Sequence, residues 1–124
     1  MTDEMLKFQG SWRQIAYEKD GLPEPPDEQG WEPRSTITGD RFVVTLADGR
    51  VVIEGTFTLD PTTEPKSVDW TDTFGDDAGK TFPAIYTLEG DRLTFCAADD
   101  SLPRPTEFRT RPGWVMRVMV REDG

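Results

Sequence analysis

The sequence predicts an all-β protein, a single up-and-down antiparallel β-barrel of about eight strands over residues 1–124, with a short N-terminal helical lead-in. Apolar and polar residues alternate along most of the chain, which is typical of strands with one buried face. Turns rich in glycine and aspartate separate these runs, and the corner Gly-Asp-Arg followed by an apolar residue occurs twice, at 39–42 and 90–93. Eight strands are about the number at which a closed barrel is just filled by side chains or holds one small ligand.

The first third of the chain predicts a helix, a strand and a long loop. Residues 3–9 have a short helical pattern, and residues 11–18 form the first strand, which ends at a turn containing Gly21. The segment 22–34 contains four prolines, which cannot continue a central strand or a helix interior. We therefore expect 22–34 to be a long loop and a candidate lid over the mouth of the barrel.

The remaining strands follow one another as hairpins. Residues 51–59 show the cleanest alternation, with the apolar residues at odd positions on one face. The next strand places Val68 and Trp70 on a common face, and residues 74–80 form a glycine- and aspartate-rich loop. The predicted strands after the first are 36–38, 42–46, 51–59, 68–70, 82–88, 92–97 and 114–121.

Composition restricts partners, cofactors and location. There are 14 Lys and Arg against 24 Asp and Glu, a net charge of −10 that repels phosphate backbones and anionic lipids. We expect no nucleic-acid and no membrane binding, whereas a basic protein partner fits this charge. With no histidine and one cysteine, Cys96, the chain lacks an internal disulfide and the usual ligands of zinc and haem. We expect no metal, no cofactor and, because residues 1–7 lack an export-signal pattern, a cytoplasmic location.

Two loop motifs resemble ligand sites but lack the required context. Residues 75–81 resemble a phosphate loop, yet they are one residue short between the glycines, contain two aspartates and precede a strand pattern instead of a helix. Four aspartates between 69 and 77 offer oxygen ligands, but their spacing matches no defined calcium loop. We interpret both segments as solvated loops.

The N-terminal motif and several later phrases resemble a known family. Gly10-Ser11-Trp12 resembles the Gly-x-Trp opening of lipocalins and the wider calycin barrels, in which the tryptophan closes the barrel floor under an arginine of the last strand. From Leu6 to Glu122 the chain resembles a family of uncharacterised bacterial lipocalin-like domains that is numerous in planctomycetes. The matching phrases are Phe8 to Trp12, Gly55 to Pro61 with Pro65-Lys66 and Asp69, Ile85-Tyr86 through Cys96, Arg104 to Phe108, and Arg121-Glu122. The resemblance implies a calycin-like fold compatible with a ligand cavity, and it transfers no catalytic residue.

The last predicted strand contains two arginines that are candidates for the floor arginine implied by this resemblance. Arg117 or Arg121 stacking on Trp12 would form the calycin-like floor, a structural role. Arg117 lies between Met116 and Val118, so it either points outward or, if it points inward, needs a carboxylate as its partner, because an unpaired buried guanidinium is very costly. Anchoring of a ligand is the alternative role.

The candidate ligand-binding residues are mainly aromatic. Alternation assigns Phe42, Phe57, Trp70, Tyr86, Phe95, Trp114 and Met116 to inward faces, where most of them form core. If the interior is not completely filled, these residues line an apolar pocket, with Tyr17 or Tyr86 as a polar handle and the 22–34 loop, carrying Trp31, as its cover. Glu107 is a further candidate, as a carboxylate aimed into the cavity.

Three functions fit these observations. The leading hypothesis is a small intracellular barrel that binds an apolar or aromatic molecule in its interior. The first alternative is an acidic interaction module of the immunity or inhibitor type, marked by acidic residues clustered around Trp31 or Trp70 on one exposed face. The second is a cofactor-free cyclase or isomerase, marked by a carboxylate or tyrosine of perturbed pKa, such as Glu107 or Tyr86, aimed into an enclosed cavity. No catalytic residue is identified.

Overall fold

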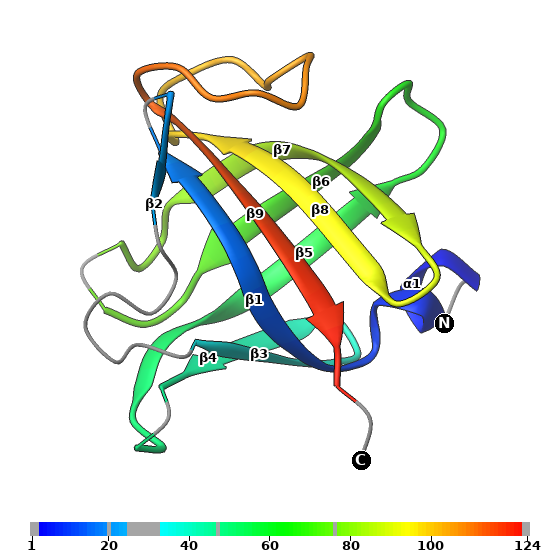
Figure 1. The fold of residues 1–124 in the computed structure, drawn as a ribbon, viewed down its shortest axis with the longest axis vertical. Coiled ribbons are helices and arrows are strands. Elements are labelled where there is room, and N and C mark those ends of the chain that lie inside the picture. Colours follow the sequence, from blue (N-terminus) through cyan, green and yellow to red (C-terminus); the bar gives the residue numbers. More distant parts are fainter. Residues whose placement is uncertain (1–2, 20, 25–32, 47, 76, 123–124) are drawn as a thin grey trace.

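The computed structural model describes residues 3–19, 21–24, 33–46, 48–75 and 77–122, which form one short helix and nine strands. Figure 1 shows the strands wrapped into a barrel, with the helix at one end. In chain order the elements are α1 (Asp3–Phe8), β1 (Gly10–Lys19), β2 (Leu22–Glu24), β3 (Arg34–Thr38), β4 (Arg41–Thr45), β5 (Val51–Asp60), β6 (Lys66–Asp72), β7 (Thr81–Glu89), β8 (Arg92–Ala98) and β9 (Trp114–Arg121).

Eight of these strands close into an antiparallel barrel. From β3 to β9 each strand pairs with the next along the chain, and β1 pairs with β3 on one edge and with β9 on the other. The prediction of an all-β, up-and-down antiparallel barrel of about eight strands with a helical lead-in is confirmed. Closure removes the unpaired strand edges that an open sheet would expose.

The short strand β2 corrects one boundary. Residues 22–24 are not loop, because they pair with Tyr17, Glu18 and Lys19 of β1, beyond the point where β3 stops. This place at the edge of the sheet tolerates Pro23, because an edge strand can spare a backbone N–H. The rest of the expected lid, residues 25–32 with Trp31, lies outside the described residues.

A β-bulge in β1 decides which side chains enter the barrel. Trp12 and Gln14 pair with alternate residues of β9, but the register then shifts between Gln14 and Ala16, so that Tyr17 pairs with Arg117. The extra residue reverses the alternation of side chains. Trp12, at an even position, and Tyr17, at an odd one, therefore both face the interior.

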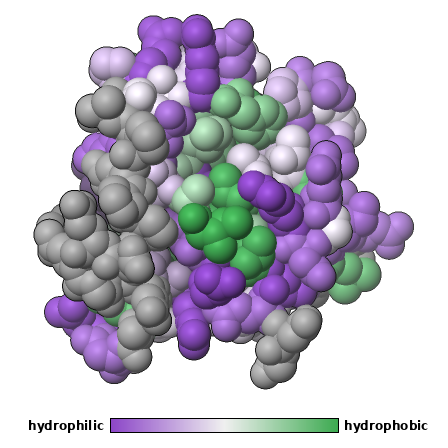
Figure 2. Space-filling model, viewed as in Figure 1, coloured by the Kyte–Doolittle hydropathy of each residue, from purple (hydrophilic) through white to green (hydrophobic). Residues whose placement is uncertain are grey.

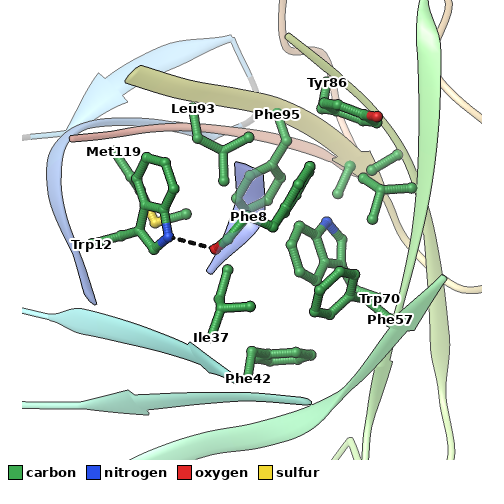
Figure 3. Packing of buried hydrophobic residues seen from close by; sticks show 13 residues of the cluster. Phe8, Trp12, Ile37, Phe42, Phe57, Trp70, Tyr86, Leu93, Phe95 and Met119 are labelled. Atoms are coloured by element: carbon green, nitrogen blue, oxygen red, sulfur yellow. Dashed lines mark hydrogen bonds between the residues drawn. The ribbon is translucent and has the colours of Figure 1, made fainter. Parts of the chain in front are cut away.

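The end of the barrel beside α1 is closed by a compact apolar core. Phe8 of α1 is completely buried, and its ring lies 5.6 Å from that of Phe57 and 5.0 Å from that of Tyr86. The indole Nε1 of Trp12 donates a 2.9 Å hydrogen bond to the carbonyl oxygen of Phe8, as Figure 3 shows. The guanidinium of Arg121 covers the other side of the Trp12 ring, 4.3 Å from its centroid.

Residues 99–113, which connect β8 to β9, pack against the outer face of the barrel. Nη1 of Arg104 donates to the carbonyl oxygens of Val68 and Ala84, at 3.2 and 2.9 Å, and Nη2 forms a 2.7 Å ion pair with Asp69. Under this connection Cys96 is completely buried, with Sγ 3.2 Å from the carbonyl oxygen of Arg109. The 99–113 connection thus covers Cys96, which faces outward from β8. Burial raises the pKa of the Cys96 thiol to about 11.

Candidate functional site

The half of the barrel away from α1 contains a cavity of about 290 Å³. Its mouth lies where β1 ends and β9 begins, since Lys19 and Val115 both line it. Its aromatic walls are formed by Tyr17, Phe42, Trp70, Phe82 and Phe95. The aliphatic part of the lining includes Ile37, Val44, Ile53, Val115 and Met119, and the polar or charged part includes Gln14, Lys19, Ser35, Asp72, Asp77, Asp99 and Arg117.

Trp70 separates this cavity from the core below it. Its ring centroid lies 5.3 Å from those of Phe42 and Phe57 and 5.0 Å from that of Phe95. Figure 3 shows these rings grouped inside the barrel. The side chain is 8% exposed, and within the described part of the chain its indole Nε1–H has no hydrogen-bond acceptor. A buried donor without an acceptor costs free energy, and because this nitrogen is itself shielded from solvent, it is not open to the cavity.

Asp72, the last residue of β6, brings a carboxylate into the apolar lining. It pairs with Gly55 of β5, whose missing side chain makes room for the ring of Phe42. The Asp72 carboxylate makes no hydrogen bond or ion pair to any other residue that the structure describes. Partial burial, with a smaller contribution from the charge of Asp77, raises the pKa of Asp72 to about 6, although the charge of Arg117 acts in the opposite direction.

Arg117 supplies a positive charge to the same cavity. Its Nη1 donates a 2.7 Å hydrogen bond to Oε1 of Gln14, and its guanidinium carbon lies 4.4 Å from the centroid of the Tyr17 ring. The sequence left open whether Arg117 points outward or inward, and the structure shows that it points inward. The contacts of its guanidinium given above are with a neutral amide and an aromatic ring. Arg117 is not part of the floor, because Arg121 is the arginine that stacks on Trp12.

Four of the residues expected to bind a ligand line the cavity together: Tyr17, Phe42, Trp70 and Phe95. Phe57 and Tyr86 instead belong to the closed core, and the hydroxyl of Tyr86 donates a 2.5 Å hydrogen bond to Oε2 of Glu4. Burial and this contact raise the pKa of Tyr86. Tyr86 is therefore a structural group that holds α1, and it does not provide a polar handle inside the cavity.

Two other candidates lie outside the barrel. Glu107 belongs to the 99–113 connection, is exposed, and pairs with Arg109 at 2.6 Å. Met116 pairs with Cys96, whereas Arg117 pairs with the cavity residue Phe95, so the expected inward direction of Met116 and Trp114 is wrong. Figure 2 shows an apolar patch over β9, where partly exposed Met116, Val118 and Val120 occupy the outward positions of this strand.

Several cavity residues were missed by sequence reasoning, chief among them Asp72. It lies two residues after Trp70 on the same strand, so the alternation that placed Trp70 inward also places Asp72 inward. The sequence interpretation instead assigned Asp72 to a solvated acidic loop. Gln14 was not predicted, because the candidate residues were chosen for an aromatic ring or a charge and its side chain has neither.

Neither metal ligands nor a membrane-spanning helix are found in the described ranges. There, no group of three or more Cys, Asp or Glu side chains is arranged to hold a metal ion. The helix among these residues, six residues long, falls well short of the length and apolarity needed to cross a membrane. Comparison of the chain with protein-family models, with curated proteins and with solved structures finds no match.

Proposed function

We propose that this protein binds a small apolar or aromatic molecule in the interior of its barrel. The observation that carries this proposal is the cavity of about 290 Å³, walled by five aromatic rings and containing a few polar groups. Concave, mostly apolar sites with a small number of placed polar side chains are the usual form of small-molecule sites.

The cavity dimensions favour a compact ligand. A volume of about 290 Å³ is near the lower end of the range of roughly 300–1,000 Å³ found for ligand pockets. We therefore propose a molecule about the size of one or two fused aromatic rings. The stacking of Arg121 on Trp12 is consistent with the lipocalin-like resemblance, which we retain as a proposal for the family.

Acid–base catalysis on such a molecule is the second candidate. Asp72 supports it, because a carboxylate with a pKa of about 6 in an apolar wall can exchange a proton near neutral pH. This carboxylate takes the place that the sequence hypothesis gave to Glu107 or Tyr86. The interaction-module hypothesis loses one of its two expected centres, because Trp70 is buried and cannot lie in an exposed acidic face, while Trp31 lies outside the described residues.

A cavity-filling substitution tests the binding proposal. Ala97 is buried in the cavity lining, and Ala97→Phe would occupy part of the space that a ligand needs. Thr94→Phe is the matched control, because Thr94 belongs to the same strand but pairs with Val118 on the outer face. With 1-naphthalenemethanol as the probe and tryptophan fluorescence as the signal, we expect Ala97→Phe to weaken binding by at least about 10-fold and Thr94→Phe to leave it unchanged. Equal effects of the two variants, or no binding to the wild type, would overturn the proposal.

A further inference from the structure

We propose that the cavity selects a cationic molecule, an arylalkyl amine whose ammonium group binds the carboxylate of Asp72. This inference rests on the proposed function and gives the chemical class of its ligand. It depends on three features of the cavity: a carboxylate to which no described residue donates, an arginine already in contact with other groups, and aromatic faces beside both.

The Asp72 carboxylate is a partly buried charge in the wall of the cavity. It is partly buried at the end of β6, and no described residue donates a hydrogen bond to it or forms an ion pair with it. A carboxylate removed from water without donors is costly, whereas the N–H groups of an ammonium ion provide both charge and hydrogen bonds. Binding of a cation at this position therefore relieves an existing penalty.

Arg117 does not act as this counterion. Its guanidinium donates to the Gln14 side chain and stacks on Tyr17. It lowers the pKa of Asp72 from a distance, but the combined effect of burial and Asp77 remains larger, so the pKa is still raised. The two opposite charges of the wall are thus held apart, and a ligand cation has access to the carboxylate.

The aromatic faces and the charge around the mouth favour the same ligand. Trp70, Phe42 and Phe82 lie in the lining with Asp72, and aromatic faces attract cations as well as apolar rings. Asp77, which pairs with Lys80 at 3.2 Å, and Asp99 add negative charge to the lining, and Lys19 and Arg117 add positive charge, so that with Asp72 the acidic groups are in excess. The net charge of −10 attracts cations toward the protein over longer distances.

Three probes with one ring system and different charge test the inference: 1-naphthylmethylamine, 1-naphthalenemethanol and 1-naphthoate, titrated into the full chain at pH 7.5 by calorimetry. We expect the amine to bind at least about 10-fold more tightly than the alcohol, and the carboxylate to bind most weakly. The variant Asp72→Asn should reduce the affinity for the amine to that for the alcohol and leave the alcohol unchanged. The variant Asp40→Asn removes the same charge from an exposed turn at the closed end and should change neither affinity.

The pH dependence gives a second readout. Between pH 7.5 and pH 5 the amine remains protonated, whereas Asp72, with a pKa of about 6, becomes neutral. Affinity for the amine should therefore fall about 10-fold over this range, and the fall should be absent in Asp72→Asn.

The outcomes separate this inference from the proposed function. If none of the three probes binds, the cavity is not a binding site for such molecules and both fail. If the alcohol binds and the amine binds no more tightly, or if Asp72→Asn leaves the preference intact, the inference fails while the proposed function stands. Tightest binding of the carboxylate would overturn it in favour of Arg117 as the anchor.

Discussion

Arg121 stacks on the indole ring of Trp12, and the same guanidinium group donates hydrogen bonds to the carbonyl oxygens of Lys7 and Gln9. One side chain of the last strand thus holds the first strand and the end of α1 together. Its Nε also pairs with Asp91 at 3.0 Å, in the turn between β7 and β8. The closed end of the barrel depends on this arginine for contacts that no apolar residue could replace.

Arg121→Ala should therefore destabilise the protein by about 2–4 kcal/mol, since it removes the cation–π contact and leaves backbone acceptors without donors. Urea denaturation followed by tryptophan fluorescence measures this loss. Arg92→Ala, at an exposed position of the neighbouring strand β8, should cost less than about 0.5 kcal/mol. Similar costs for the two variants would mean that the Arg121 contacts contribute little.

Gly55→Ala should damage the cavity directly. An added Cβ would lie 2.1 Å from the carbonyl oxygen of Thr71 and 2.8 Å from the Phe42 ring, so β5, β6 or the ring must shift. We expect a loss of about 2–4 kcal/mol from this overpacking, together with weaker binding of 1-naphthalenemethanol. At Gly39 an added Cβ meets no atom within 4 Å, but φ is +62°, so Gly39→Ala should cost only about 1 kcal/mol. A smaller loss at Gly55 than at Gly39 would contradict this account.

Tyr86→Phe should loosen α1 in a pH-dependent way. Burial of Glu4 opposes its ionisation, but hydrogen bonds from Tyr86 and Lys66, with the charges of Lys66 and Lys7, outweigh burial and lower the pKa of Glu4. This contribution to stability is present above the ordinary pKa of 4.5 and is lost as the pH falls through the lowered value. At pH 7 the variant should lose about 1–2 kcal/mol, and less at pH 3. In a double-mutant cycle with Glu4→Gln, purely additive costs would show that the two side chains are not coupled.

Asp72→Asn should stabilise the protein at neutral pH. Because the pKa of Asp72 in the folded chain is raised to about 6, the wild type is most stable with this group protonated and loses that contribution as the pH rises from about 4 through 6. The variant should gain about 1–2 kcal/mol at pH 7.5, after allowance for solvent screening, and close to nothing at pH 4. Thermal unfolding at both pH values measures the difference. A variant less stable than the wild type at pH 7.5 would show that Asp72 has a stabilising partner.

The strand pattern was predictable from the sequence because most strands have one apolar face. Residues 53–59 of β5 illustrate this, since they have the alternation that the sequence predicts. Val51, expected on the same inward face, is exposed instead, because a register shift in the pairing with β4 places it opposite Thr45. The faces of β9 were not predictable in the same way. Apolar residues occupy both odd and even positions of 114–121, so alternation alone cannot decide whether Met116 or Arg117 faces the interior. Pairing with β1 and β8 decides it, and that pairing depends on neighbours distant in the sequence.

The candidate site was predictable in its aromatic part only. Tyr17, Phe42, Trp70 and Phe95 are large rings on regular strands, whereas Asp72 lies where the strand pattern gives way to an acidic run. Tyr86 and Phe57 face the interior, as the cavity residues do, but they lie nearer α1. Alternation along a strand predicts which residues face inward, but it does not predict how far along the barrel axis each one lies. The outer packing of residues 99–113 follows from Arg104, whose backbone acceptors belong to two other strands.

The bulge between Gln14 and Ala16 lets β1 serve the closed core through Trp12 and the cavity through Gln14 and Tyr17. Trp12 belongs to the closed core, and changes there alter stability. The residues after the bulge meet the cavity through Tyr17 and Lys19, and changes there alter what the protein can hold. Selection acting on ligand preference could thus change Gln14, Tyr17 and Lys19 while leaving the Trp12 end of the strand untouched, and related chains should vary more from residue 14 onward than before it.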